Sequence, residues 1–232
     1  FEPLPKYKPA LLPANERRRA SAVVRLAFGA CEDAVGERIE EASQLAGVFT
    51  ASGGDYDIND QICRALLEDD KAVSPTQFHN SVHNAAAGYW SIASKSHATS
   101  VSLSSYNDSV SAGILEALTL LAIEKMSVLL VCGDHKISPP MHKHRPIDQP
   151  FAAALWLSPE LSANAIAKLD ISISNNDSVE TQSLLPEFEA MRCDNPAAKI
   201  LPLLELLARN DEGSVVFSMA GSQTLQVTLS SC

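Results

Sequence analysis

The segment from residue 100 to residue 132 constrains the fold of this chain more than any other. Ser100–Ser104 alternates polar and apolar side chains, which is typical of a strand with one buried face. Val128–Cys132 is a short apolar run that indicates a fully buried strand, and Ser109–Ile123 between them repeats apolar residues at helical spacing. A strand, a helix and a second strand in this order predict a right-handed crossover between parallel strands, and so an α/β fold.

The rest of the chain supplies further elements of both kinds. Asn15 is predicted to cap a long helix over Arg17–Val35, because apolar residues recur there at helical spacing. Residues 138–150 carry four prolines and are expected to form a basic surface loop, whereas residues 175–195 are polar and expected to be irregular. The other predicted elements are a buried strand over 47–51, helices over 58–67, 84–92 and 197–209, central strands over 151–157 and 166–173, and a closing hairpin of strands 214–219 and 224–229. Together these elements predict one α/β domain with a mixed sheet.

Composition argues against several classes of function. The net charge of −10 disfavours non-specific binding to nucleic acid or to anionic membranes. The five cysteines are scattered without a CxxC pair, so neither structural zinc nor a disulfide framework is expected, and a cytoplasmic location is the default. No apolar run is long enough to span a bilayer, and no cofactor is predicted. Because the chain opens on Phe1 rather than on Met, we expect its natural start to lie upstream.

Residues 73–92 (VSPTQFHNSVHNAAAGYWSI) carry the most specific motif. Here Ser74-Pro75 is followed by Asn84 and Gly88 in an Asn-x-x-x-Gly pattern, and in this the chain resembles the N-terminal half of β-ketoacyl synthases. Four further blocks are similar to that family in the same order: a first long helix (17–35), a glycine-rich turn (52–54), a nucleophile elbow (100–109) and a glycine-ending core strand (128–136).

The resemblance implies a thiolase-like fold, whose ketosynthase N-terminal half is a βαβαβ mixed sheet flanked by helices. We expect a single domain over residues 1–232, made of an extended arm (1–14), a ketosynthase-like core (15–137) and a divergent remnant of the second half (138–232). The second half is expected to be reduced because the His-Gly-Thr and Gly-His contexts of the family's catalytic histidines do not occur. All six histidines precede residue 145.

The catalytic nucleophile of the family is also missing. Decarboxylative condensation needs a thiolate on a strand-to-helix turn and two donors that stabilise the enolate. A gapless register puts Asn107 at the cysteine position, and a shift of one or two residues would put Tyr106 or Ser105 there instead. Asp108 beside it would disfavour an anion on the turn. We therefore predict no catalytic residue in this chain.

Loss of both features resembles the chain length factors of type II polyketide systems, and the half-length form resembles the partner found in aryl polyene clusters. The resemblance implies a heterodimer with a full-length ketosynthase in polyene, polyketide or fatty-acid-type chain elongation. An acyl carrier protein would then be met only indirectly. Whether the residues predicted to face the partner line its acyl tunnel or only pack the interface stays open. They are Ser52, Gly53, Gly54, Phe78, His79, Ser81, Asn84, Gly88, Ser102 and Ser104.

Other interpretations compete with this one. The chain could be an acyl-carrier-dependent acyltransferase or decarboxylase that uses Asn107 or a serine, or a carrier-binding module without a ketosynthase partner. His79 and His83 have the spacing of a zinc pair, but a structural role is preferred because no third ligand accompanies them. Serine hydrolysis is disfavoured because the GxSxG motif is absent. Arg17–Arg19 is interpreted as a solvated helix turn, and Ala85–Gly88 as a site of close packing between helix and strand.

Overall fold

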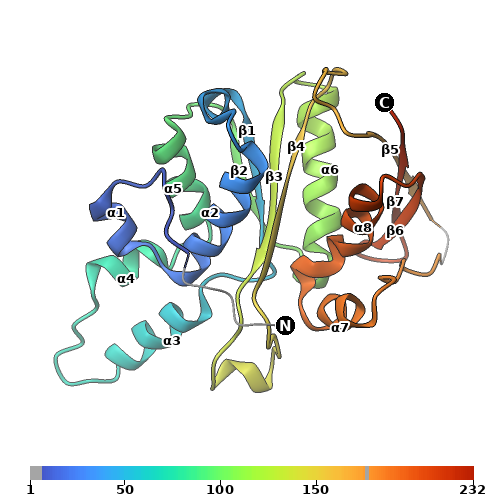
Figure 1. Ribbon diagram of the computed structural model, residues 1–232. Helices are drawn as coiled ribbons and strands as arrows, with labels where there is room; N and C mark the ends of the chain where they lie inside the picture. The colour runs from blue at the N-terminus through green and yellow to red at the C-terminus, as the bar shows by residue number, and fades with distance from the viewer. Residues whose placement is uncertain (1–6, 176–177) are drawn as a thin grey trace.

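Two β-sheets and the helices around them make up the protein, as the computed structural model shows (Figure 1). It describes residues 7–175 and 178–232, so the first six residues of the predicted arm lie outside the described part. Residues 7–13 form neither helix nor strand. They are held to the body by Glu32, whose carboxylate accepts hydrogen bonds from the Tyr7 hydroxyl and from the backbone N–H groups of Ala10 and Leu11.

The larger sheet has the strand order β2-β1-β3-β4. Strands β1 (Ala46–Thr50), β2 (Ser100–Leu103) and β3 (Val128–Asp134) are mutually parallel, and β4 (Phe151–Leu157) runs antiparallel to β3. The predicted βαβαβ mixed sheet is therefore confirmed. The prediction that β4 is central was wrong. It is an edge strand, and its apolar residues are covered by α2 (Ala22–Val35) on one side and by the short 3₁₀ helix η4 (Pro196–Ile200) on the other.

Helices cover both faces of this sheet (Figure 1). On one face α2 (Ala22–Val35) and α5 (Ala85–Ser94) pack together, with the rings of Phe28 and Trp90 edge to face at 5.4 Å. On the other face lies α6 (Ser109–Ala122). Strand β3 serves both sides, because successive side chains point to opposite faces. Leu129 and Val131 belong to the α2–α5 cluster, whereas Val128, Leu130 and Cys132 belong to the α6 cluster.

The long helix predicted over residues 17–35 is in fact two helices. α1 spans Ala14–Arg19 and α2 starts at Ala22, so Asn15 lies inside α1 and does not cap it. The predicted single helix was wrong because Ser21 provides a separate N-cap: its hydroxyl accepts a hydrogen bond from the backbone N–H of Val24 at 3.3 Å. Two turns of 3₁₀ helix, η1 (Ile39–Gln44), then lead into β1.

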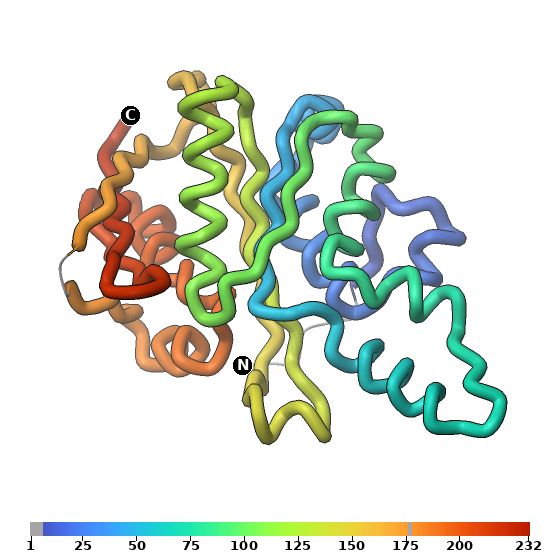
Figure 2. The backbone as a smooth tube through the Cα atoms, turned by 180° about the vertical axis from the view of Figure 1, so that it is seen from behind, coloured from blue at the N-terminus to red at the C-terminus, as the bar shows by residue number. Residues whose placement is uncertain are grey.

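Helices α3 (Tyr56–Ala65) and α4 (Pro75–Asn80) form an arm that projects from the body (Figures 1 and 2). The Asp55 side chain caps α3 by accepting from the backbone N–H of Ile58 at 3.1 Å. Pro75 occupies the first turn of α4, where a missing backbone N–H costs nothing. The Ser74-Pro75 motif noted in the sequence thus marks the start of a helix.

A three-stranded antiparallel sheet follows, in the order β5-β7-β6. Its strands are β5 (Lys168–Ser174), β6 (Gly213–Ser218) and β7 (Thr224–Ser230). The predicted β6–β7 hairpin is confirmed, and Gly221 supplies the left-handed residue of its turn with φ +81°. The prediction that residues 166–173 form a central strand was wrong, because β5 lies at the edge of this second sheet.

The helices beside this second sheet also differ from expectation. α7 (Pro186–Asp194) lies within the segment predicted to be irregular. Its sequence is polar, and Arg192 holds it by pairing with Glu189 three residues earlier at 2.7 Å. The helix predicted over 197–209 divides into η4 (Pro196–Ile200) and α8 (Leu201–Arg209), since Pro196 and Pro202 each begin a new helical segment. None of the described helices is long and apolar enough to cross a membrane.

Candidate functional site

The connection between β2 and α6 is a sharp strand-to-helix turn. Its 3₁₀ helix, η2 (Tyr106–Asp108), leads straight into α6, and the backbone N–H of Ser105 donates to the Ser109 hydroxyl at 3.0 Å. Tyr106 has φ +53°, the left-handed conformation that bulky residues avoid. The left-handed residue is therefore the one directly before Asn107. A gapless register pairs Asn107 with the nucleophile.

Arg145 reaches this turn from the loop between β3 and β4. Its Cζ atom lies 3.6 Å from the centroid of the Tyr106 ring, and its Nη1 atom donates to the Asn107 Oδ1 atom at 2.9 Å. The residue is only 8% exposed. Residues 138–150 were predicted to form a basic surface loop, and for Arg145 this prediction was wrong, because its side chain is buried. No local pattern could have shown its role, because 38 residues separate it from Asn107.

Asp134, at the end of β3, ties the strand ends together. Its Oδ1 atom accepts from both the backbone N–H and the hydroxyl of Ser52 at 2.8 Å, and the Ser104 hydroxyl donates to the Ser52 carbonyl at 3.0 Å. Burial raises the pKa of Asp134 to about 6, although the hydrogen bonds from Ser52 and the charge of Arg145 oppose that shift. Two predicted interface residues, Ser52 and Ser104, thus serve this internal network.

The other side of the turn is held by the smaller sheet. The Ser218 hydroxyl donates to the Asp108 Oδ1 atom at 2.5 Å, and Lys199 lies 3.8 Å from the same oxygen. Lys199 also donates to Glu180 at 2.7 Å. Burial alone would raise the pKa of Glu180, but the hydrogen bonds from Lys199 and Ser218 lower it to about 2. Asp108 is therefore engaged at the start of α6, where its negative charge suits the helix dipole.

The chemistry available at this turn does not include a thiolate. Residues Ser104–Ser109 read Ser-Ser-Tyr-Asn-Asp-Ser. Cys132 belongs to the neighbouring strand β3, and burial raises the pKa of its thiol to about 12. The Asn107 carbonyl is already bound to Arg145. An amide, a phenol and a guanidinium are groups that bind and position; none is an activated nucleophile here.

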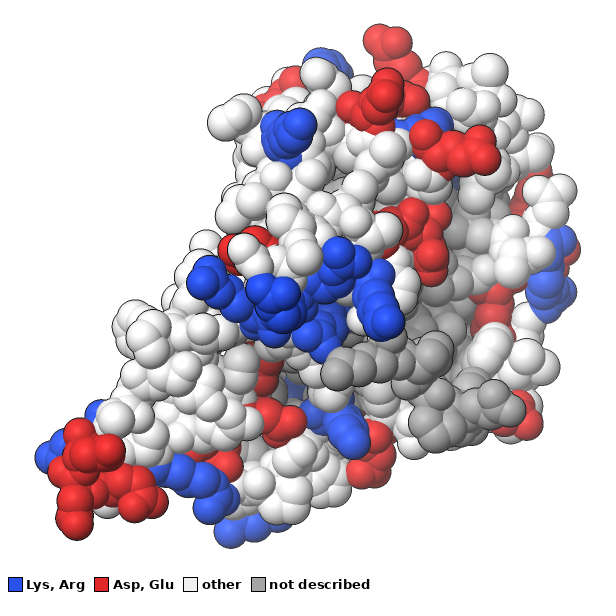
Figure 3. Space-filling model, turned by 60° about the vertical axis from the view of Figure 1, so that its left-hand side comes forward, with Lys and Arg blue, Asp and Glu red and all other residues white. Residues whose placement is uncertain are grey.

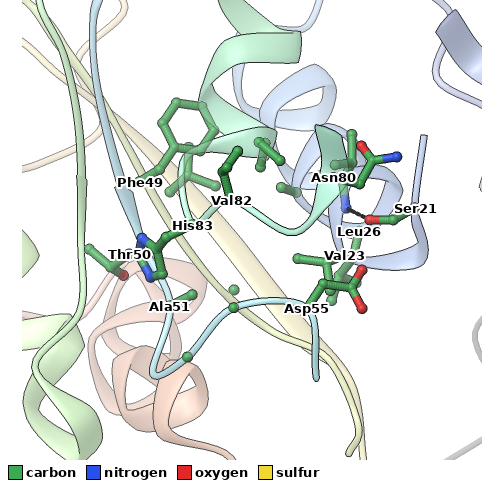
Figure 4. A pocket seen from close by; sticks show the side chains of 18 residues that line it. Ser21, Val23, Leu26, Phe49, Thr50, Ala51, Asp55, Asn80, Val82 and His83 are labelled. Carbon is green, nitrogen blue, oxygen red and sulfur yellow. Dashed lines mark hydrogen bonds between the residues drawn. The ribbon is translucent and has the colours of Figure 1, made fainter. Parts of the chain in front are cut away.

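The predicted glycine-rich turn lies beside a small pocket (Figure 4). Gly53 and Gly54 line it together with apolar side chains such as Leu26, Phe49 and Val82, and it has room for about 40 Å³. At Gly53 an added Cβ atom would lie 2.1 Å from the Tyr56 hydroxyl, so a side chain there would require the Tyr56 ring to move. The glycine turn and the segment that follows α4 thus line the same pocket.

Other predicted interface residues lie on or near α4. Phe78 is 66% exposed, and the Ser81 hydroxyl donates to its carbonyl at 2.8 Å. The His79 ring meets that of Tyr89 edge to face at 5.6 Å. His83 lies beyond the end of α4, so the two histidines do not share a helix. The described residues contain no group of three or more potential metal ligands.

The remaining predicted positions lie around α5 and β2. Asn84 precedes α5, Gly88 lies within it, and Ser102 belongs to β2. An added Cβ atom at Gly88 would meet nothing within 4 Å, so the prediction that this glycine permits close packing inside the chain was wrong. Gly113 of α6 has that role, since a Cβ atom there would lie 2.3 Å from the Thr50 side chain.

The predicted solvated turn Arg17–Arg19 lies in α1, where Arg18 and Arg19 are exposed. Figure 3 shows basic side chains gathered on the face of the molecule that α1 helps to form. Arg19 lies 3.4 Å from Glu16, and Arg25 donates to the Arg17 carbonyl at 3.0 Å. These contacts are local and do not reach the strand-to-helix turn.

Comparisons with known proteins bear on this arrangement. A family model described as "Beta-ketoacyl synthase, N-terminal domain" matches residues 2–219. A chain in the structure of a ketosynthase in complex with its chain length factor from Xenorhabdus doucetiae is 26% identical, with a TM-score of 0.67 over 97% of this chain and 84% of that one. A β-ketoacyl synthase from Burkholderia phymatum shares the fold at 13% identity, with a TM-score of 0.71 over 99% of this chain and 87% of that one. No curated protein gives a significant match.

Proposed function

The chain belongs to the β-ketoacyl synthase family, and from this premise we propose that it is a non-catalytic subunit that pairs with an active ketosynthase. The observation that carries the proposal is the strand-to-helix turn. Where condensation requires a thiolate, Tyr106 is stacked on Arg145 and Asn107 is hydrogen-bonded to it. A turn built in this way holds side chains in place and offers no thiolate to carry an acyl chain.

Similarity to the Xenorhabdus structure supports the choice of partner. That structure holds a ketosynthase and a chain length factor in one complex. The alignment covers most of both chains, so this chain is comparable in length to the one it matches. We propose that it acts in the manner of a chain length factor, in type II polyketide or aryl polyene chain elongation. An acyl carrier protein would then dock mainly on the partner.

The face formed by α5, β2 and the start of α6 is our proposed interface (Figure 2). Within the described residues β2 pairs only with β1, so its other edge is open. Beside it α5 exposes Gly88 and Ile92, and the segment before α5 exposes Val82. An open strand edge beside exposed apolar side chains is a surface that another chain can complete. We propose that β2 pairs there with a strand of the ketosynthase.

We further propose that Phe78 and the Ser52–Gly54 turn reach the partner's acyl tunnel. Support comes from the exposure of Phe78 and from the small apolar pocket that the glycine turn shares with Val82. In a heterodimer that synthesises chains, Phe78→Ala should change the distribution of product lengths, because the tunnel gains the volume of a ring. Mass spectrometry of the products measures this. Unchanged products would leave Phe78 as an interface residue only.

Co-expression with candidate ketosynthases tests the function as a whole. We expect a stable one-to-one complex, and condensation that needs both chains but survives Asn107→Ala in this one. A chain that purifies as a stable monomer with no affinity for any ketosynthase would contradict the proposal. If the chain alone turned over malonyl-loaded acyl carrier protein, and Asn107→Ala abolished this turnover, the result would instead support an acyltransferase or decarboxylase.

A further inference from the structure

We propose that Tyr106 is the anchor residue of the interface with the ketosynthase partner. This inference rests on the proposed function and adds to it the residue that holds the two subunits together. The expected counterpart is an apolar recess on the ketosynthase with a hydrogen-bond acceptor at its floor, because a buried tyrosine needs a partner for its hydroxyl.

The backbone of Tyr106 gives the first reason. A φ of +53° is costly for a residue with a Cβ atom, whereas glycine adopts it freely. Glycine would therefore make this turn with less strain. A bulky residue in a strained conformation is a sign that its side chain has a role, since the fold alone does not require it.

The setting of the ring gives the second reason. Tyr106 is 58% exposed although it is aromatic, and one face of its ring lies against the Arg145 guanidinium at 3.6 Å. Arg145 is itself buried and is bonded to Asn107, so the ring stands on a fixed support. A ring that is already ordered loses little conformational freedom on binding, which favours affinity. Tyrosines in such settings dominate many interfaces.

Position gives the third reason. Tyr106 follows the open strand β2 by three residues and precedes α6 by three. The connection that contains it lies on the same face as β2 and α5 (Figure 2). A ketosynthase that pairs with β2 would reach the turn that follows the strand, where the Tyr106 ring is exposed. The inference thus extends the proposed interface from a strand edge to a specific side chain.

Affinity measurements on variants of the full chain test this anchor. Tyr106→Gly removes the ring and also relieves the strained backbone, so we expect at least a 30-fold rise in the Kd for the ketosynthase, which is the loss typical of an interface hot spot. The melting temperature should change little, because relief of strain offsets the lost stacking on Arg145. Tyr106→Phe keeps the ring and should raise the Kd less than about tenfold. Ile123→Ala, at the far end of α6 and 75% exposed, is the matched control and should leave the Kd unchanged.

The outcomes separate this inference from the proposed function. If the wild-type chain binds no ketosynthase, the proposed function and the anchor both fail. If the wild-type chain binds and Tyr106→Gly binds equally well, the anchor is overturned while the proposed function stands. Loss of binding by both Tyr106→Gly and Ile123→Ala would also overturn it, because the effect would then not be specific to the ring.

Discussion

At the scale of single residues, the strand-to-helix turn and the strand ends beside it are held by side chains from distant parts of the chain. Asn107 and Tyr106 are held by one buried arginine, and Asp134 binds Ser52 with two hydrogen bonds. The residues that could be named from sequence are those of the turn itself, because a register against a family motif gives them directly. Arg145 and Asp134 could not be named, because their roles depend on contacts between segments far apart in the chain.

Asp134 leads to a prediction about pH. Its folded pKa of about 6 lies above the ordinary value of 3.8, so the folded state binds the proton more tightly than the unfolded state does. Its contribution to stability is therefore present below pH 4 and is lost as the pH rises through 6, by about 3 kcal/mol. Asp134→Asn should gain stability relative to wild type over that range, as measured by urea unfolding at a series of pH values. Parallel curves would contradict this, and the exposed Asp69→Asn is the control.

At the scale of elements, local signals decided what could be predicted. The apolar runs of β1 and β3 and the alternation in β2 marked these strands to within two residues at either end. The break between α1 and α2 was missed because the apolar spacing lies wholly in α2, and the basic residues Arg17–Arg19 before it read as its first turn although they belong to the separate helix α1. The cap at Ser21 marks where α2 begins. α7 was missed because its sequence is polar. It is held instead by ion pairs of Arg192 with Glu189 and Glu180. Edge and central strands could not be told apart, because helices cover β4 as well.

Two helical glycines provide a contrasting pair of substitutions. Gly88→Ala should stabilise the isolated chain by up to about 1 kcal/mol, because alanine is the better helix former and a Cβ atom there meets nothing. Gly113→Ala should destabilise it by about 1–3 kcal/mol, because the Cβ atom would press on Thr50. Denaturant unfolding measures both. If the α5 face is an interface, Gly88→Ala should in addition weaken binding of the ketosynthase; a variant that is stabler and binds equally well would argue against that use of α5.

At the scale of the whole molecule, the open edge of the larger sheet is the feature that most suggests a second subunit. The carbonyls of Thr99 and Leu103 accept hydrogen bonds from Gly47 and Ala51. The backbone N–H and C=O groups of successive residues in a strand point to opposite sides. Those of Ser100 and Ser102 therefore point away from β1, toward the open edge. Unpaired backbone groups along a strand edge are a surface that a strand of another chain can complete.

Ser102→Pro tests that edge. Proline removes a backbone N–H that points away from β1, so the chain's own sheet should survive, as proline is tolerated on edge strands. Pairing with a partner strand should be lost. We expect near-native circular dichroism together with loss of the one-to-one complex in size-exclusion chromatography. Leu103→Pro is the opposite case, because its N–H faces β1, and it should unfold the chain. A complex that tolerates Ser102→Pro would show that β2 is not the contact.

The alternation of β3 between two apolar clusters has a consequence for how the chain unfolds. Leu129 and Val131 complete one cluster, and Val128, Leu130 and Cys132 complete the other. If either cluster unfolded by itself, one face of β3 would lose its apolar cover, although the other cluster still depends on that strand. Unfolding by heat or denaturant should therefore be a single cooperative transition. A substitution that destabilises the α2–α5 cluster should also destabilise the α6 cluster.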